Sequence, residues 1–107
     1  MSPFEIEKVV NSHPKVLESA AVAVPSELGE DEVKIFVVLR PDEEVEPEAL
    51  FAICEERMAY FMVPRYVEFV DALPKTATER VQKLSLREQG IGNAWDRGKA
   101  GYTLIRV

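Results

Sequence analysis

The sequence predicts a small α+β domain in which a three-stranded sheet is flanked by helices. Three observations support this fold class. The chain has 107 residues, 47% of them hydrophobic, which is enough for one compact core. Segments with the apolar spacing of helices and of strands follow one another in the order helix, strand, strand, helix, strand, helix. No internal repeat or low-complexity tract breaks this order.

The first half of the chain predicts a helix and a β-hairpin. Apolar residues recur at helical spacing over residues 3–10, and Pro14 ends that helix. Residues 16–24 are an apolar run typical of a strand buried on both faces. Residues 33–40 alternate in the manner of a second strand. Because a short turn joins the two strands, we expect them to pair antiparallel.

The second half predicts two further helices and one further strand. Pro47 can start a helix that carries an apolar stripe. Residues 65–70 have the alternation of a third strand, and residues 84–89 look helical, with Gly90 as the cap. Trp95 is the expected anchor of the polar segment that follows.

A predicted helix begins almost at the first residue of the chain. Ser2, Pro3 and Glu5 have the spacing of a capping box with proline at the first helical position. We therefore expect the sequence to be a piece of a longer protein. The residues do not distinguish a native Met1 from one added at a domain boundary.

Charge and cysteine content narrow the class of protein. The net charge is −6, and residues 26–56 hold eleven Asp or Glu residues against two cations, which makes nucleic-acid binding a poor hypothesis. A single cysteine excludes an internal disulfide and fits a reducing compartment. No signal peptide and no apolar run of bilayer length is present. We expect a cytoplasmic protein without a membrane span.

The sequence offers no metal site and no obvious nucleophile. His13 is the one histidine, and its place beside Pro14 predicts a surface or hydrogen-bonding residue that ends a helix. Cys54 lies on an apolar helix face and is expected to be a small core residue. The glycines lack the spacing of a phosphate-binding loop.

Residues 73–87 form a basic segment on an otherwise acidic chain. Its charged side chains are four cations and one anion: Lys75, Arg80, Lys83, Arg87 and Glu79. A solvated surface segment is the usual fate of such a cluster. The alternative is a loop that brings a cation to a phosphate, where Thr76 and Thr78 could add hydroxyl contacts.

Several short motifs, in order, make the chain resemble the small C-terminal domain of the adenylate-forming enzymes. This superfamily includes acyl- and aryl-CoA synthetases, luciferases and peptide-synthetase adenylation domains. The most recognisable pieces are Met62-Val63-Pro64-Arg65 and Leu73-Pro74-Lys75-Thr76, and residues 2–7, 13–25, 29–30 and 33–38 add to them. Within the superfamily the pattern is most similar to carnitine- and crotonobetaine-CoA ligases.

The resemblance implies a two-step reaction. A carboxylate attacks ATP to give an acyl-adenylate and pyrophosphate, and the thiol of coenzyme A then displaces AMP. Residues 1–107 would be the mobile closing domain, with the large N-terminal domain absent and this piece inactive alone. The implied partners are that large domain and a small carboxylic acid. Mg²⁺ is expected in the full-length enzyme but not bound by this domain.

The resemblance also implies a site residue, with a departure. The family places a catalytic lysine after a glycine, within Thr-Gly-Lys, whereas this chain has Thr78-Glu79-Arg80. Arg80 therefore stands at the lysine position. Arg80 can take the lysine's role, Lys83 or Lys75 can substitute for it, or the adenylation step is weakened. We favour Arg80, with Lys83 as the fallback, and Lys75, Thr76 and Thr78 as candidate contacts to the nucleotide.

Two other hypotheses stay open. One is a free-standing small α+β interaction domain that grips a partner through the acidic residues 42–48 or through the basic segment. The other is an adenylation domain that loads a carrier protein. The acyl substrate, the residues that contact coenzyme A and the oligomeric state are not specified by the sequence.

Overall fold

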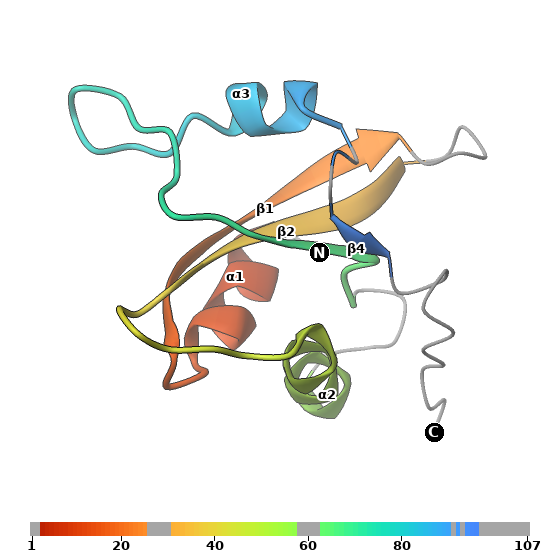
Figure 1. Cartoon of the computed structure of the whole chain (residues 1–107). Coiled ribbons are helices and arrows are strands. Elements are labelled where there is room, and N and C mark those ends of the chain that lie inside the picture. The colour runs from red at the N-terminus through yellow and green to blue at the C-terminus, as the bar shows by residue number, and fades with distance from the viewer. Residues whose placement is uncertain (1–2, 26–30, 58–62, 91, 93, 97–107) are drawn as a thin grey trace.

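The first six helices and strands follow the predicted order, and a two-residue strand comes after them. The computed structural model describes residues 3–25, 31–57, 63–90, 92 and 94–96, so the cap predicted at Ser2 lies outside the described residues. The elements are α1 (Pro3–Asn11), β1 (Val16–Pro25), β2 (Asp31–Leu39), α2 (Pro47–Arg57), β3 (Tyr66–Phe69), α3 (Lys83–Glu88) and β4 (Trp95–Asp96). Figure 1 labels all of them except β3. The α+β class is confirmed.

The strands form one mixed sheet in the order β1-β2-β3-β4. β1 and β2 pair antiparallel, as expected, with Val22 opposite Lys34. β2 and β3 run parallel, and the two-residue β4 pairs antiparallel with β3 and extends the edge of the three main strands. Trp95 of β4 packs on Phe51, with ring centroids 5.1 Å apart, while most of the segment that it was expected to anchor lies outside the described residues.

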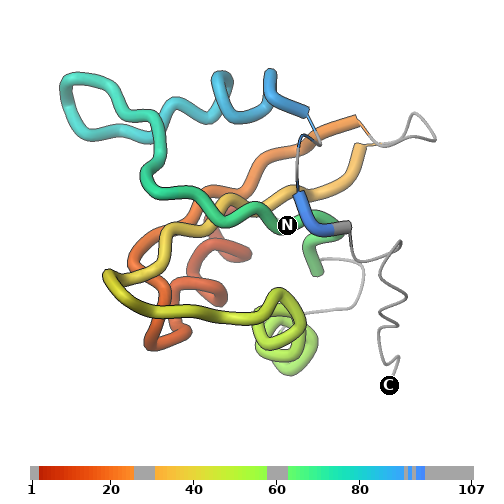
Figure 2. The backbone as a smooth tube through the Cα atoms, viewed as in Figure 1, coloured from red at the N-terminus to blue at the C-terminus, as the bar shows by residue number. Residues whose placement is uncertain are grey.

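Helices cover both faces of the sheet. α1 and α2 lie against one face and α3 lies against the other (Figures 1 and 2). Successive strand residues point to opposite faces, so β1 and β2 feed two separate apolar clusters. Ala21 and Ile35 join the cluster with α1 and α2, whereas Ala20 and Phe36 join the cluster with α3. The prediction that β1 is buried on both faces is confirmed.

One charged side chain lies inside the α3-side layer. Lys34 is fully buried, and its Nζ donates to Oε1 of Glu68 at 2.9 Å and to the carbonyl of Gly90 at 3.0 Å. The same ammonium lies 4.2 Å from the centroid of the Phe36 ring. Gly90, predicted to cap α3, has φ of 61°. Lys34 therefore fastens the end of α3 to β2 and β3.

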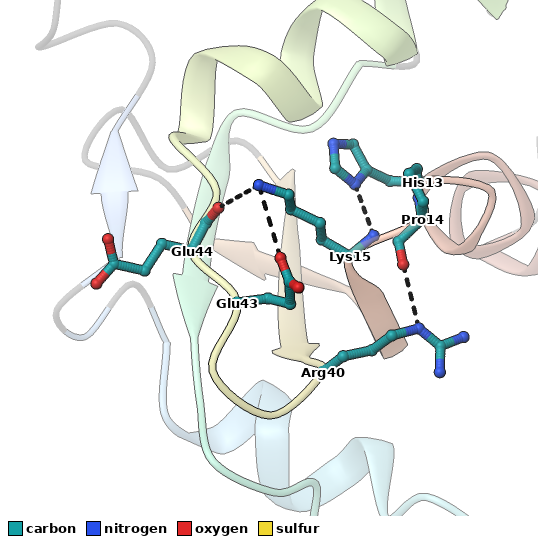
Figure 3. A network of polar contacts seen from close by, with 6 residues as sticks. All are labelled: His13, Pro14, Lys15, Arg40, Glu43 and Glu44. Carbon is teal, nitrogen blue, oxygen red and sulfur yellow. Dashed lines mark hydrogen bonds and ion pairs between the residues drawn. The ribbon is translucent and has the colours of Figure 1, made fainter.

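His13 and Cys54 take the structural places that the sequence suggests. Nδ1 of His13 accepts the backbone N–H of Lys15 at 3.1 Å, just after α1 (Figure 3). Cys54 is 1% exposed in the cluster between α2 and the sheet. Burial raises the pKa of the Cys54 thiol to about 12. A thiol held neutral in this way is a poor nucleophile.

Candidate functional site: the basic loop

The predicted basic segment begins as a projecting loop. We call this loop, residues 73–82, the basic loop. It lies between β3 and α3 in the chain. It extends beyond α3 at the upper left of Figures 1 and 2. Its base is held: Leu73 is buried against the α3-side cluster, and the Gln82 N–H donates to the Pro74 carbonyl at 2.8 Å. Lys75 and Val81 form an antiparallel bridge. The two ends of the loop are therefore fixed to the domain and to each other, and its middle projects.

The tip of the basic loop is a tight turn between Thr76 and Arg80. The Thr76 N–H donates to the Arg80 carbonyl at 2.8 Å, and the Glu79 N–H donates to the Thr76 carbonyl at 3.0 Å. Glu79 has φ of 64°, in the left-handed region that favours glycine. This is the position where the resemblance predicts glycine, and here a glutamate adopts the conformation that glycine takes readily.

The candidate cations differ in what surrounds them. Nζ of Lys75 lies 3.1 Å from Oε1 of Glu18, and Nζ of Lys83 lies 2.6 Å from Oε2 of Glu7. The guanidinium of Arg80 has neither a hydrogen bond nor an ion pair within the described part of the chain. Arg80 is thus an exposed cation at the tip that is available to an anion, whereas both lysines are already paired.

The threonine hydroxyls lie at the tip but interact within the loop. Oγ1 of Thr76 accepts the Arg80 N–H at 3.3 Å, and the two hydroxyls of Thr76 and Thr78 are 3.0 Å apart. The structure therefore brings Arg80, Thr76 and Thr78 together. It places Lys75 at the base of the loop and Lys83 at the start of α3.

The carboxylates that hold the two lysines were not anticipated from the sequence. Glu18 is 57 residues from Lys75, and no local spacing connects such a pair. Glu7 also accepts the Ala21 N–H at 2.8 Å, so it joins α1, β1 and α3. Only the sheet order, which places β1 beneath the basic loop and α3, could have indicated these contacts.

Two hollows on the surface do not include the tip of the loop. One, of about 460 Å³, lies where β2 and β3 end, and its rim includes the acidic side chains of Asp42, Glu43 and Asp71. Arg40 lines the same hollow, so both signs of charge are present there. The other, of about 290 Å³, lies between the starts of α1 and α3. Arg80 lines neither of them.

The acidic segment that one hypothesis assigned to a partner is partly occupied by the chain itself. Nζ of Lys15 lies 3.6 Å from Glu43 and 3.5 Å from the Glu44 carbonyl, and Nε of Arg40 donates to the Pro14 carbonyl at 3.1 Å (Figure 3). These contacts attach the segment after β2 to the end of α1. Of the acidic side chains in this segment, that of Glu43 therefore has a structural role already, and Glu44 contributes its backbone carbonyl.

Within residues 3–25, 31–57, 63–90, 92 and 94–96, no group of three or more His, Cys, Asp or Glu side chains is placed to hold a metal ion. None of the helices in this part of the chain combines the length and the apolar character needed to cross a bilayer.

Comparison with known proteins identifies the family. The model of the AMP-binding enzyme C-terminal domain matches residues 5–80, which include the tip of the basic loop up to Arg80. The chain belongs to this family. The resemblance that the short motifs indicate is therefore confirmed, and Glu79 and Arg80, where the resemblance implies glycine and lysine, lie inside the matched region.

The relatives of this AMP-binding enzyme C-terminal domain include several CoA ligases. The chain is 41% identical over 87 residues to the crotonobetaine/carnitine–CoA ligase of Proteus mirabilis, covering 81% of the chain and 17% of the relative. It is 42% identical over 89 residues to the long-chain-fatty-acid–CoA ligase of Yersinia pestis, covering 83% of the chain and 16% of the relative. The chain thus spans about a sixth of the length of these relatives.

Solved structures have the same fold over this domain. ATP-bound MatB of Rhodopseudomonas palustris is 32% identical with a TM-score of 0.79, covering 83% of this chain and 18% of that chain. The anthranilate CoA ligase AuaEII, solved with anthranoyl-AMP, is 34% identical with a TM-score of 0.80, over 84% and 18%. The amide bond synthetase McbA of Marinactinospora thermotolerans is 31% identical with a TM-score of 0.77, over 82% and 18%.

Proposed function

We propose that this chain is the closing domain of an ATP-dependent acyl-CoA ligase and that Arg80 acts in its first step. The supporting observation is the state of the three candidate cations. Lys75 and Lys83 are paired with carboxylates, whereas the Arg80 guanidinium at the tip of the loop is unpaired within the described residues. Its place in the family motif is that of the catalytic lysine.

The proposed reaction has two steps. In the first, a carboxylate oxygen of the acid bonds to the α-phosphorus of ATP, and the bond to pyrophosphate breaks. In the second, the sulfur of coenzyme A bonds to the acyl carbon, the bond to the AMP oxygen breaks, and the thiol proton passes to solvent. Negative charge grows on phosphate oxygens during the first step, and a cation at that point stabilises the transition state.

Arginine suits this task in one respect and differs from lysine in another. Its guanidinium stays charged at every physiological pH and can donate two parallel hydrogen bonds to neighbouring phosphate or carboxylate oxygens. It is longer and planar, so it reaches an oxygen pair at a different angle from an ammonium. An extended tip on a fixed base, as the basic loop provides, can accommodate that difference.

The acid and the other partners are part of the proposal. Crotonobetaine or carnitine is the first acid to test, because a ligase for these compounds is 41% identical to the chain. A long-chain-fatty-acid ligase is 42% identical, so similarity in this domain does not select the acid. We place the acid pocket, the Mg²⁺ site and most of the ATP and coenzyme A contacts in a large N-terminal domain, and the enzyme in the cytoplasm.

One observation favours a second acceptor besides coenzyme A. McbA, whose domain has the same fold, is described as an amide bond synthetase. An amine can therefore be considered as the nucleophile of the second step. A carrier-protein thiol is the further alternative that the sequence left open.

The test uses the full-length protein that carries this chain. Isotope exchange between pyrophosphate and ATP is measured with crotonobetaine, butyrate, octanoate and cinnamate, and the second step is then followed with coenzyme A, a pantetheine-loaded carrier protein and a simple amine. We expect exchange that requires a carboxylic acid, AMP as the nucleotide product, and a thioester with coenzyme A. Release of ADP, or no acid-dependent exchange with any acid of the panel, would contradict the proposal.

A further inference from the structure

Thr76 is the residue on which the hydrogen bonds of the loop tip converge. Its N–H donates to the Arg80 carbonyl at 2.8 Å and its carbonyl accepts the Glu79 N–H at 3.0 Å. Its hydroxyl oxygen accepts the Arg80 N–H at 3.3 Å and lies 3.0 Å from the hydroxyl of Thr78. Glu79 and Arg80, the two residues that depart from the family motif, are therefore both hydrogen-bonded to Thr76.

We propose that the Thr76 hydroxyl positions Arg80 for the adenylation step and does not itself bind the nucleotide. This inference rests on the proposed function. Specifically, the Thr76 side chain compensates for the absence of glycine at position 79, where the backbone is left-handed with φ of 64°.

The reason lies in the conformation of Glu79. A residue with a Cβ pays an energetic cost in the left-handed region, so this turn persists only where neighbouring bonds favour it. If Glu79 relaxed to negative φ, the chain would leave the turn in another direction and carry Arg80 with it. The Thr76 hydroxyl bonds to the backbone of Arg80, immediately after Glu79, and so opposes that relaxation.

The ion pairs beside the loop cannot replace this bond, and the backbone bonds of Thr76 with Glu79 and Arg80 act together with it. The ion pairs of Lys75 with Glu18 and of Lys83 with Glu7 fix the base of the loop and the start of α3, not its tip. Thr76 is exposed, so its removal leaves the apolar clusters intact. A variant at this position should therefore disturb the presentation of Arg80 while the domain stays folded.

A direct nucleotide contact by Thr76 predicts different kinetics. A hydroxyl that bound ATP would affect ground-state binding, so its loss would raise the KM for ATP. A hydroxyl that positions Arg80 affects the step in which Arg80 acts, so its loss lowers kcat. The existing bonds of the hydroxyl to Arg80 and Thr78 favour the second outcome.

The experiment compares Thr76→Val with Thr76→Ser in the full-length enzyme, using ATP and the acid of the panel that gives the fastest exchange. We expect Thr76→Val to lower the kcat of adenylate formation about tenfold, with the KM for ATP and thioester formation from preformed adenylate within about twofold of the parent. Thr76→Ser, which keeps the hydroxyl, should restore the rate. In an Arg80→Ala background Thr76→Val should have no further effect.

The outcomes separate this inference from the proposed function. Unchanged adenylation in Arg80→Ala would overturn the role of Arg80 and with it any positioning role for Thr76. If Arg80→Ala is slow but Thr76→Val is as fast as the parent, only the positioning role is overturned. A rise in the KM for ATP alone, or a Thr76→Ser variant as slow as Thr76→Val, would also overturn it. An unchanged thermal midpoint of Thr76→Val shows that the variant is folded.

Discussion

At the scale of single residues, the backbone at Glu79 matters as much as the charge at Arg80. A non-glycine residue at φ of 64° costs about 1 kcal/mol relative to an ordinary backbone conformation. The loop keeps this geometry because its tip is bonded within itself from Thr76 to Arg80. The direction in which Arg80 leaves the turn is therefore a property of the backbone, and the side chain supplies the charge.

Restoring the family motif tests whether backbone and charge can be separated. In the full-length enzyme, Glu79→Gly combined with Arg80→Lys should keep or raise the rate of adenylate formation, because glycine removes the strain and lysine keeps a cation at the tip. Single-turnover formation of the acyl-adenylate is the measurement. Glu79→Ala, which keeps the Cβ and loses the charge, is the control. A fall of the double variant by more than about tenfold would show that this loop requires its own pair of residues.

At the scale of elements, α3 carries the basic loop but is too short to be stable alone. It has 6 residues and is held at its start by Lys83 bonded to Glu7, and in its middle by the buried Leu86. Beyond its end, the Gly90 carbonyl accepts a bond from Lys34. These contacts therefore fix α3 against the sheet and, with it, the base of the basic loop.

The Lys83–Glu7 pair should act on stability and not on catalysis. Lys83→Met is expected to lower the free energy of unfolding by about 1 kcal/mol or less, since the lysine is half-exposed, and to change the adenylation rate by less than about threefold. Glu7→Gln keeps an acceptor for the Ala21 N–H and completes a double-mutant cycle, measured by urea unfolding. A loss of adenylation comparable to that of Arg80→Ala would return the catalytic role to Lys83.

The buried pair of Lys34 and Glu68 makes a sharper prediction for the sheet. Glu68→Leu leaves the Lys34 ammonium buried without this carboxylate, so we expect a loss of roughly 3–5 kcal/mol in unfolding free energy. Lys34→Met combined with Glu68→Leu should recover much of that loss, because an apolar pair fits the α3-side cluster. Urea unfolding of the single and double variants checks this. A double variant less stable than Glu68→Leu would contradict it.

At the scale of the whole molecule, periodicity predicted the elements but not every neighbour. The apolar run at 16–24 and the alternation at 33–40 correctly indicated the β1–β2 hairpin, since its partners are close in sequence. The parallel pairing of β2 with β3 and the short β4 depend on packing between distant segments. Lys34 shows what periodicity cannot predict. The alternation of residues 33–40 identifies its strand, but a lysine in such a pattern is expected on a solvent-exposed face. Lys34 is buried because α3 covers that face of the sheet.

The candidate site likewise has features that the sequence predicted and features that it did not. The alignment of Leu73-Pro74-Lys75-Thr76 placed Arg80 and Glu79 in the motif, and the structure adds the left-handed turn. The partners of Lys75 and Lys83 lie on β1 and α1, so no local pattern could indicate that these cations are already paired.

The core makes a prediction about pH. Cys54 has a pKa of about 12 when folded, against an ordinary value of 9.0. Between these values the unfolded thiol loses its proton and the folded thiol keeps it, so the free energy of unfolding falls by about 1.4 kcal/mol per pH unit as pH rises. Below about pH 9 this residue contributes no pH dependence.

Urea unfolding at about pH 8 and about pH 10 measures this effect. The parent chain should lose about 1.4 kcal/mol more between these pH values than Cys54→Ala, because the variant lacks the thiol although its cavity lowers stability at both. Equal pH dependence in the two chains would show that the thiol is not protected from ionisation.

The most direct test of the central claim is the single-turnover rate of acyl-adenylate formation by full-length enzyme with Arg80→Ala. We predict a loss of about a hundredfold or more in this step, with thioester formation from preformed adenylate within about threefold of the parent. Arg80→Lys should retain much of the rate, since it keeps the charge. Equal losses in both steps, or an unchanged first step, would contradict the assignment of Arg80 as the cation that serves adenylation.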